Sequence, residues 1–340
     1  MSGKAPLKWI LIPVAVIGTV AALRFQPWKS LAAENKAVQA QNLLKVGYLP
    51  VTCHLTCPVT DFASKTSTKN RFESWRFNDF PTIVETLKSG RLEATFMVAP
   101  LAMKMREQGF PVRIVYLGHR DGSTLMVRSD LPAKDLRDLR GKSVALPSKA
   151  SNQNIVIHKL MDDQGIKEGE INFVEMAPPD MPGALAAKAI DAFFVGEPHP
   201  ARSELDGSGR ILYMAKDIWP DFISCVLVVH ENLIANQPEL VRDLVRGIAE
   251  SGQWAETHRE EAAKVAAPYF RQDVKVVRHV LNHPGRVKYV NLTPTDEEMM
   301  RISDMAVRLG ILKQPVQISQ LIDRSFIPEN IQPARIVLND

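Results

Sequence analysis

The sequence predicts an α/β protein with two lobes, each a mainly parallel sheet flanked by helices. Short buried strands alternate with helices in two separate stretches of the 340-residue chain, residues 43–122 and residues 127–221. Such alternation favours parallel pairing, because each helix returns the chain to the same end of the sheet. The strands end in loops of small and polar residues, as ligand-binding loops at the carboxyl edge of a parallel sheet do. We therefore expect a ligand cleft between the two lobes.

The first 33 residues have the composition of a targeting segment. Lys4 and Lys8 precede residues 9–23, which carry no charge, and the segment Ser30-Leu31-Ala32-Ala33, with small residues at three of its four positions, follows. This layout is typical of a secretory signal peptide. As a helix, the uncharged run would span roughly 22 Å, short of the ~30 Å hydrocarbon core of a bilayer. Basic residues beyond the run leave an uncleaved N-terminal membrane anchor as the alternative, and both interpretations predict an exported, extracytoplasmic protein.

The charge balance argues against nucleic-acid binding. The chain has 42 Lys and Arg against 38 Asp and Glu. Four of the basic residues (Lys4, Lys8, Arg24 and Lys29) and no acidic residue lie in the first 32 positions, so the remainder carries 38 of each sign. A body with balanced charge has no net attraction for a polyanion.

Three cysteines are too few for a disulfide scaffold, and their odd number leaves at least one without an intramolecular partner.

The first stretch begins with a predicted strand at residues 43–49 and a loop at residues 52–60. Ile83, Val84 and Leu87 have helical spacing, with a proline in the first turn and a glycine after the last. The polar residues 66–71 predict a flexible loop, and Trp75 and Phe77 are expected in the loop region that follows. The other elements predicted here are a helix at 80–89, a strand at 94–98, a helix at 101–108 and a strand at 112–117.

The second stretch repeats the alternation with its own strands and helices. Strands are predicted at 143–146, 172–176 and 190–195, with helices at 155–164 and 183–189. Helices at 238–255, 260–267 and 296–309 follow. The predicted division is a first lobe of residues 43–122 plus 226–325, a second lobe of residues 127–221, and two hinge strands at 123–128 and 223–229.

Four segments of the chain carry a resemblance to a known family: VGYLP at 46–50, DLRGKSVALP at 138–147, AIDAFFVGEP at 189–198 and NQPELV at 236–241. With these segments, the chain over residues 43–325 resembles the periplasmic substrate-binding components of ABC transporters, in the branch that handles nitrate, bicarbonate, sulfonates, taurine and thiamine-pyrimidine precursors. The resemblance implies a two-lobed type II periplasmic binding protein fold, no catalysis, no cofactor and docking to a membrane permease. We expect a periplasmic monomer that captures a small polar or anionic organic molecule.

The first loop departs from the nitrate and sulfonate pattern, because it contains Cys53, His54 and Cys57. With Cys225 on the predicted hinge, these residues offer ligands for Cu(I) or Zn(II). Alternatively, Cys53 and Cys57 form a local disulfide, since one helical turn separates their Cα atoms by roughly 6 Å. A third interpretation is that all are unpaired thiols lining a pocket. His54 is expected either to contact the ligand or to be a solvated loop histidine.

Polar residues at the ends of the strands complete the candidate site. Ser148, Ser151 and Asn152 can cap a helix whose free N–H groups favour an anion. Glu197 follows a strand into the same crevice, where it would bind an amine, a metal or a hydroxyl group, or form a salt bridge between the lobes. The predicted ligand-binding set is Thr52, Cys53, His54, Cys57, Ala99, Ser123, Ser148, Ser151, Asn152 and Glu197.

No spacing in the sequence supports a Ser-His-Asp triad, a catalytic carboxylate pair or a glycine-rich phosphate loop. Three other functions remain open: a binding protein for a pyrimidine or another thiamine precursor, a metal-dependent enzyme or redox sensor that uses the Cys53-His54-Cys57 loop, and a membrane-anchored sensory module.

Overall fold

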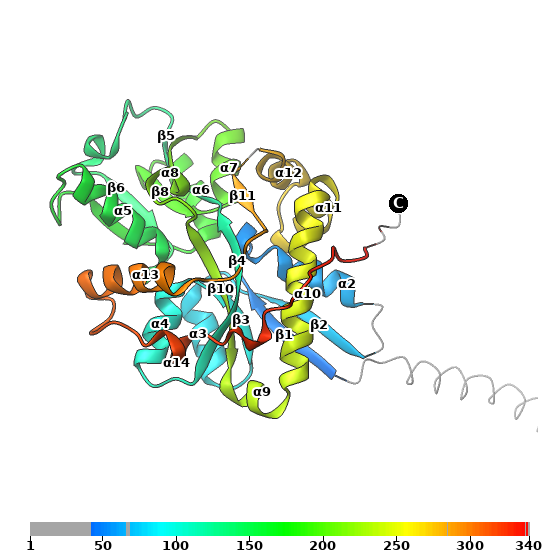
Figure 1. Cartoon of the computed structure of the whole chain (residues 1–340). Helices are drawn as coiled ribbons and strands as arrows, with labels where there is room; N and C mark the ends of the chain where they lie inside the picture. Colours follow the sequence, from blue (N-terminus) through cyan, green and yellow to red (C-terminus); the bar gives the residue numbers. More distant parts are fainter. Residues whose placement is uncertain (1–41, 66–68, 284, 337, 339–340) are drawn as a thin grey trace, which may run out of the picture.

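The computed structural model describes residues 42–65, 69–283, 285–336 and 338, and the leader predicted at residues 1–33 lies outside this part. No helix in the described ranges is both long enough and apolar enough to cross a membrane. The elements form two mixed sheets flanked by helices, which confirms the predicted α/β class (Figure 1).

The first sheet has the strand order β11-β4-β10-β3-β1-β2. Parallel pairing joins β1 to β2 and β3, as the βα alternation predicts. However, β10 lies antiparallel between β3 and β4, so β4 is not the parallel neighbour of β3 that the alternation suggested. The strands are β1 (Asn42–Tyr48), β2 (Asn70–Arg76), β3 (Ala94–Met97), β4 (Val112–Asp121), β10 (Ile223–His230) and β11 (Val287–Lys288).

The second sheet has the order β7-β6-β8-β5-β9. Here β6 pairs in parallel with β7 and β8, whereas β5 is antiparallel to β8 and β9. Gly122, at a φ of +72°, turns the chain from β4 in the first sheet into β5 in the second, and β10 returns it. The strands are β5 (Ser123–Arg128), β6 (Ser143–Leu146), β7 (Asn172–Glu175), β8 (Ala192–Gly196) and β9 (Gly209–Met214).

The loop predicted around residues 66–77 was largely wrong, because β2 occupies residues 70–76. Among the described strands, β2 lies at the edge of the sheet and pairs with β1 alone, so several of its side chains are partly exposed. A polar edge strand lacks the apolar run that marks a buried one. Trp75 lies in β2 and Phe77 directly follows it, with ring centroids 5.6 Å apart.

The helices begin where the sequence offers caps. Asp79 accepts a hydrogen bond from the Thr82 N–H at 2.8 Å, and Ser151 accepts one from the Asn154 N–H at 3.1 Å. The helices are α2 (Thr56–Ser64), α3 (Phe80–Lys88), α4 (Ala99–Glu107), α5 (Asn152–Asp163), α6 (Met181–Ala186), α7 (His199–Leu205), α8 (Ala215–Ile218), α9 (Glu231–Asn236), α10 (Pro238–Thr257), α11 (Arg259–Phe270), α12 (Val274–Asn282), α13 (Asp296–Arg308) and α14 (Ile318–Leu321). The 3₁₀ turns are η1 (Thr52–His54), η2 (Leu136–Leu139), η3 (Pro178–Asp180) and η4 (Arg324–Phe326).

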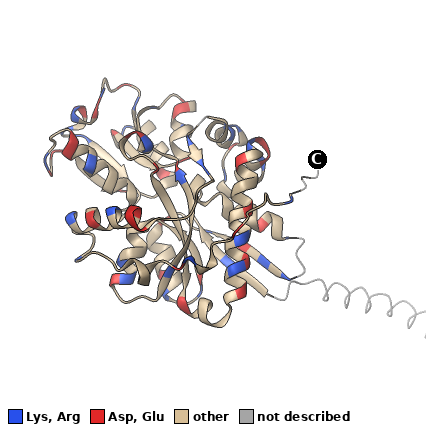
Figure 2. Ribbon diagram, in the orientation of Figure 1, with Lys and Arg blue, Asp and Glu red and all other residues tan. Residues whose placement is uncertain are grey.

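The core follows the apolar periodicity of the sequence. The long helix α10 buries Leu240, Val241, Leu244, Val245 and Ile248, which recur at helical spacing. Basic and acidic residues are interspersed on the outer helices, as Figure 2 shows. This mixture agrees with the balanced charge of residues 33–340.

Candidate functional site

A narrow, closed cleft lies between the two sheets, and its free volume of about 10 Å³ is close to that of a single water molecule. Its lining has no Lys, Arg, Asp or Glu among the described residues, and it combines apolar side chains with two thiols and one amide. The first sheet and its loops contribute Leu49, Val51, Cys53, Phe80, Val98 and Cys225, and the second contributes Pro147, Gln153, Pro178, Val195 and Gly196.

Gln153 and Phe80 are lining residues that the sequence reasoning missed. Gln153 is 3% exposed and donates its Nε2–H to Ser123 Oγ at 2.9 Å, whereas its Oε1 has no hydrogen-bond partner among the described residues. Its position one residue after Asn152 in the predicted capping segment was the available signal. The predicted residue Ser123 therefore contributes indirectly, by orienting the amide of Gln153.

The three predicted cap residues have local structural roles. Ser148 Oγ accepts the Ala150 N–H at 3.0 Å, and Ser151 caps α5. The Nδ2 of Asn152 donates to the Ile223 carbonyl, which ties α5 to β10. Asn152 lines a different hollow of about 200 Å³, which lies beside Trp219. None of the three caps is among the residues lining the narrow cleft.

Glu197 forms the salt bridge that the sequence left as an alternative to ligand binding. Arg286 places Nη2 at 2.6 Å and Nε at 2.7 Å from Glu197 Oε1, and both side chains are almost completely buried. Thr124 Oγ1 donates to Oε1 at 2.9 Å, and the Ala201 N–H donates to Oε2 at 3.0 Å. Burial opposes the charged guanidinium, but Glu197 raises the pKa of Arg286. The carboxylate of Glu197 is therefore fully occupied by protein groups.

Thr52 and Ala99 are both fully buried beside the cleft. The Thr52 N–H donates to the Glu197 carbonyl at 2.6 Å, and Thr52 Oγ1 lies 3.1 Å from His119 Nε2. Ala99 begins α4 directly after the lining residue Val98. Neither residue is among those that line the cleft.

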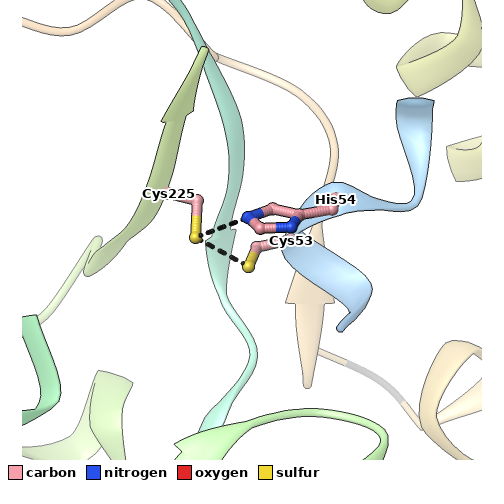
Figure 3. Close-up of side chains that lie close together, drawn as sticks. All are labelled: Cys53, His54 and Cys225. Atoms are coloured by element: carbon pink, nitrogen blue, oxygen red, sulfur yellow. Dashed lines mark hydrogen bonds between the residues drawn. The ribbon is translucent and has the colours of Figure 1, made fainter. Parts of the chain in front are cut away.

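Cys53, His54 and Cys225 form one buried cluster at the cleft, which we call the thiol cluster (Figure 3). Cys53 and His54 come from η1 and Cys225 from β10. The two Sγ atoms lie 2.8 Å apart, and His54 Nε2 lies 3.2 Å from Cys225 Sγ. The Leu49 N–H donates to His54 Nδ1 at 2.7 Å, so a neutral His54 carries its proton on Nε2 and donates toward Cys225.

This tautomer bears on the metal hypothesis. The three donor atoms lie within 4.8 Å of one another, close enough to hold one ion. However, a metal bound by Nε2 needs the lone pair of that nitrogen, and His54 would first have to give up either its Nε2 proton or its hydrogen bond from Leu49. The arrangement therefore fits a hydrogen-bonded thiol pair better than a metal centre.

The two thiols titrate as a pair. Burial opposes ionisation of Cys53, but the hydrogen bond from Cys225 and the imidazoles of His54 and His119 lower the pKa of Cys53 well below its usual value. Burial, together with the hydrogen bond and charge of Cys53, raises the pKa of Cys225 well above the usual value. The pair thus loses one proton easily and retains the other.

Cys57 lies outside the thiol cluster. Its Sγ contacts the Val46 carbonyl at 3.7 Å and Ser74 Oγ at 3.5 Å, and burial raises its pKa to about 12. All three cysteines are free thiols. The predicted alternative of a Cys53–Cys57 disulfide was therefore wrong, and so was the inclusion of Cys57 in a metal-ligand set.

Comparison with known proteins identifies the family. The model of the NMT1-like family matches residues 37–269. The chain belongs to the NMT1-like family. It is 27% identical over 199 residues to the nitrate import ATP-binding protein NrtC of Synechocystis, covering 53% of this chain but only 30% of that protein. It is 23% identical over 235 residues to the riboflavin-binding protein RibY of Chloroflexus aurantiacus, covering 66% of this chain and 67% of RibY.

Solved structures share the fold of this NMT1-like chain. The zinc-bound ligand-binding component of an ABC-type import system from Staphylococcus aureus is 24% identical, with a TM-score of 0.76, and the match covers 84% of this chain and 98% of the other. The periplasmic nitrate-binding protein NrtA of Synechocystis is 16% identical, also with a TM-score of 0.76, and the match covers 85% of this chain and 87% of NrtA. The two-lobed fold and the resemblance expected from the sequence are thus confirmed. The desulfurization enzyme DszB has the fold at a lower TM-score of 0.59, with 14% identity and coverage of 84% of this chain and 98% of DszB.

Proposed function

We propose that this protein is the solute-binding component of an ABC import system and that it holds a small organic molecule between its lobes. The observation that carries this proposal is the cleft, because both sheets contribute to its lining. A site built from two lobes can close around a solute and release it when the lobes separate. The lobes are residues 43–122 with 226–325 and residues 127–221, and residues 123–128 and 223–229 act as the hinge.

The lining of the cleft indicates the class of ligand. Apolar residues surround the buried Oε1 of Gln153, which has no partner among the described residues and can accept a hydrogen bond from the ligand. The lining offers no cationic side chain to neutralise a simple anion. We therefore favour a ligand that is not a simple anion. Within the sulfonate, nitrate and taurine class, this is a molecule that carries an N–H or O–H group beside an apolar part. A pyrimidine-type ring, which has N–H groups and apolar faces, is the second candidate for the same reason.

The ligand would be delivered to a membrane permease, and the protein would act as a monomer in the periplasm. It reaches that compartment through its first 33 residues, as a cleaved signal peptide or an N-terminal anchor. The taurine-binding periplasmic protein of Escherichia coli, which is 26% identical over 185 residues, supports this placement.

A binding screen with a cleft variant tests the proposal. The protein is titrated with taurine, alkanesulfonates, nitrate, bicarbonate and aminopyrimidines, and binding is followed by thermal shift and calorimetry. Gln153→Ala is expected to weaken binding of the best ligand roughly 5- to 10-fold, because one hydrogen bond of about 1 kcal/mol is lost. Gln314→Ala, at an exposed position outside the cleft, is the control and leaves binding unchanged. Equal affinities of the two variants would show that the ligand binds elsewhere.

A further inference from the structure

We propose that Cys53 and Cys225 are a redox-active dithiol, which closes to an intramolecular disulfide by exchange with a small organic disulfide that enters the cleft. This inference does not depend on the identity of the transported solute. It rests on the positions of the two sulfurs, on their hydrogen-bonding environment and on their access from the cleft.

The two sulfurs are brought together by tertiary structure, since 172 positions separate them in the chain. Their 2.8 Å separation is a direct contact, and only a small approach remains to the ~2.0 Å of a disulfide bond. Both cysteines are held on regular elements of the first sheet and its loops, Cys53 on η1 and Cys225 on β10 (Figure 3). The bond can therefore form without a rearrangement of the fold.

The surroundings of the thiol cluster suit thiolate chemistry. His54 donates its Nε2–H toward Cys225 Sγ, and the Leu49 N–H fixes the imidazole in that orientation. The S–H of Cys225 can in turn donate to a thiolate on Cys53. A thiolate, and not a thiol, is the species that attacks a disulfide.

The exchange is balanced in two steps. In the first, the Cys53 thiolate attacks one sulfur of the disulfide RSSR, forms a mixed disulfide Cys53–S–S–R and releases RS⁻. In the second, Cys225 sulfur attacks Cys53 Sγ, releases the second R group as a thiol that takes the Cys225 proton, and closes the Cys53–Cys225 bond. The protein loses two electrons and RSSR gains them.

Access to the thiols depends on the cleft. Both sulfur-bearing residues line it, yet they are only 3% and 2% exposed. A disulfide of the size of oxidised glutathione therefore reaches Cys53 when the lobes are apart. Cys57 is an internal reference, because it is buried away from the cleft and has neither Cys53 nor Cys225 as a contact.

Mass spectrometry of the full chain tests the proposal. The protein is incubated with mixtures of reduced and oxidised glutathione, free thiols are alkylated, and the chain is digested and mapped. The expected product has Cys53 linked to Cys225, a mass lower by two hydrogens, and no link to Cys57. Cys57→Ser, the matched control, is expected to give the same cross-link. The proposal is overturned if Cys53 and Cys225 both remain alkylatable, or if the link that forms involves Cys57.

Two variants separate the steps. Cys225→Ser removes the resolving thiol, so Cys53 is expected to retain one glutathione per chain as a stable mixed disulfide. His54→Gln is expected to give the cross-link with its rate profile displaced to higher pH, because a positioning donor to the thiol pair is lost. An unchanged pH profile in His54→Gln, or a Cys225→Ser chain that takes up no glutathione, contradicts the mechanism. Solute binding is not measured, so a negative result in the solute screen leaves this test intact.

Discussion

The buried ion pair of Arg286 and Glu197 gives the sharpest prediction for stability. The side chains are 1% and 0% exposed, and two guanidinium nitrogens lie within 2.7 Å of Glu197 Oε1. Arg286→Met leaves the carboxylate buried with only Thr124 and the Ala201 N–H as hydrogen-bond donors. Removal of one partner of a buried pair costs about 3–5 kcal/mol, so we expect the free energy of unfolding to fall by that amount.

The double variant Arg286→Met with Glu197→Gln shows whether the loss of stability comes from the unpaired buried charge or from the absence of the ion pair itself. A glutamine at position 197 can accept the Ala201 N–H with its oxygen and donate its amide to Thr124 Oγ1, so no unpaired charge remains buried at position 197. Glu204 loses its 2.9 Å contact with Arg286 Nη1 in the single and the double variant alike, and it keeps His279 Nε2 at 3.1 Å. We expect the double variant to be more stable than Arg286→Met alone, although it has lost both charges. Unfolding in urea, followed by circular dichroism, gives these free energies.

An exposed ion pair elsewhere on the protein provides the control. Arg278 pairs with Glu260 on the surface, where both side chains are 40% exposed, and Arg278→Met is expected to leave the unfolding midpoint unchanged. The reasoning is refuted if Arg286→Met lowers the free energy of unfolding by less than about 1 kcal/mol. It is also refuted if the losses measured for Arg286→Met and for Glu197→Gln alone simply add in the double variant.

Two further predictions concern a buried histidine and a glycine beside the thiol cluster. Burial lowers the pKa of His199 to about 3, below the ~6.5 of a histidine in an unfolded chain. Between these two values the unfolded state binds the extra proton. The free energy of unfolding therefore falls as the pH drops through that window, by at most about 1.4 kcal/mol per pH unit. His199→Gln is expected to flatten the dependence of the urea midpoint on pH between about pH 4 and 6.5, which lies inside that window. An equally steep dependence in the variant would contradict this assignment. A Cβ on Gly118 would lie 2.1 Å from the Cys53 carbonyl oxygen, so Gly118→Ala is expected to cost about 1–3 kcal/mol and to slow the Cys53–Cys225 cross-link. Gly183→Ala, whose Cβ would meet nothing within 4 Å, is the control, and equal urea midpoints for the two alanine variants would show that β4 does not support the Cys53 turn.

Local patterns in the sequence predicted the elements but not all of their neighbours. The apolar run that became β10 was visible, because a buried strand shows as a continuous run. Its place between β3 and β4 was not visible, since periodicity reports burial and not the strand that lies alongside. The same limit applies to β2, where one-sided pairing lets polar residues form a strand.

The site was predictable where a residue and its environment are close in the chain. Ser151 was predicted as a cap and is one, because the N–H that it binds is three residues away. Arg286 went unnoticed, since its partner Glu197 lies 89 positions earlier and no local pattern marks it. Gln153 was missed for a related reason, because which residue of a helical first turn faces a cleft depends on the opposing lobe.

The Cys-x₃-Cys spacing shows how a local rule can fail over five residues. Residues four apart share a face only in a continuous helix. Here η1 ends at His54 and α2 begins at Thr56, so the two cysteines lie in different helical segments. Cys53 therefore contacts β10, whereas Cys57 contacts β1 and β2. The break gives Cys53 a partner 172 positions away and leaves Cys57 buried apart from it, which is why the proposed redox chemistry belongs to Cys53 and Cys225 and not to the pair that the spacing suggested.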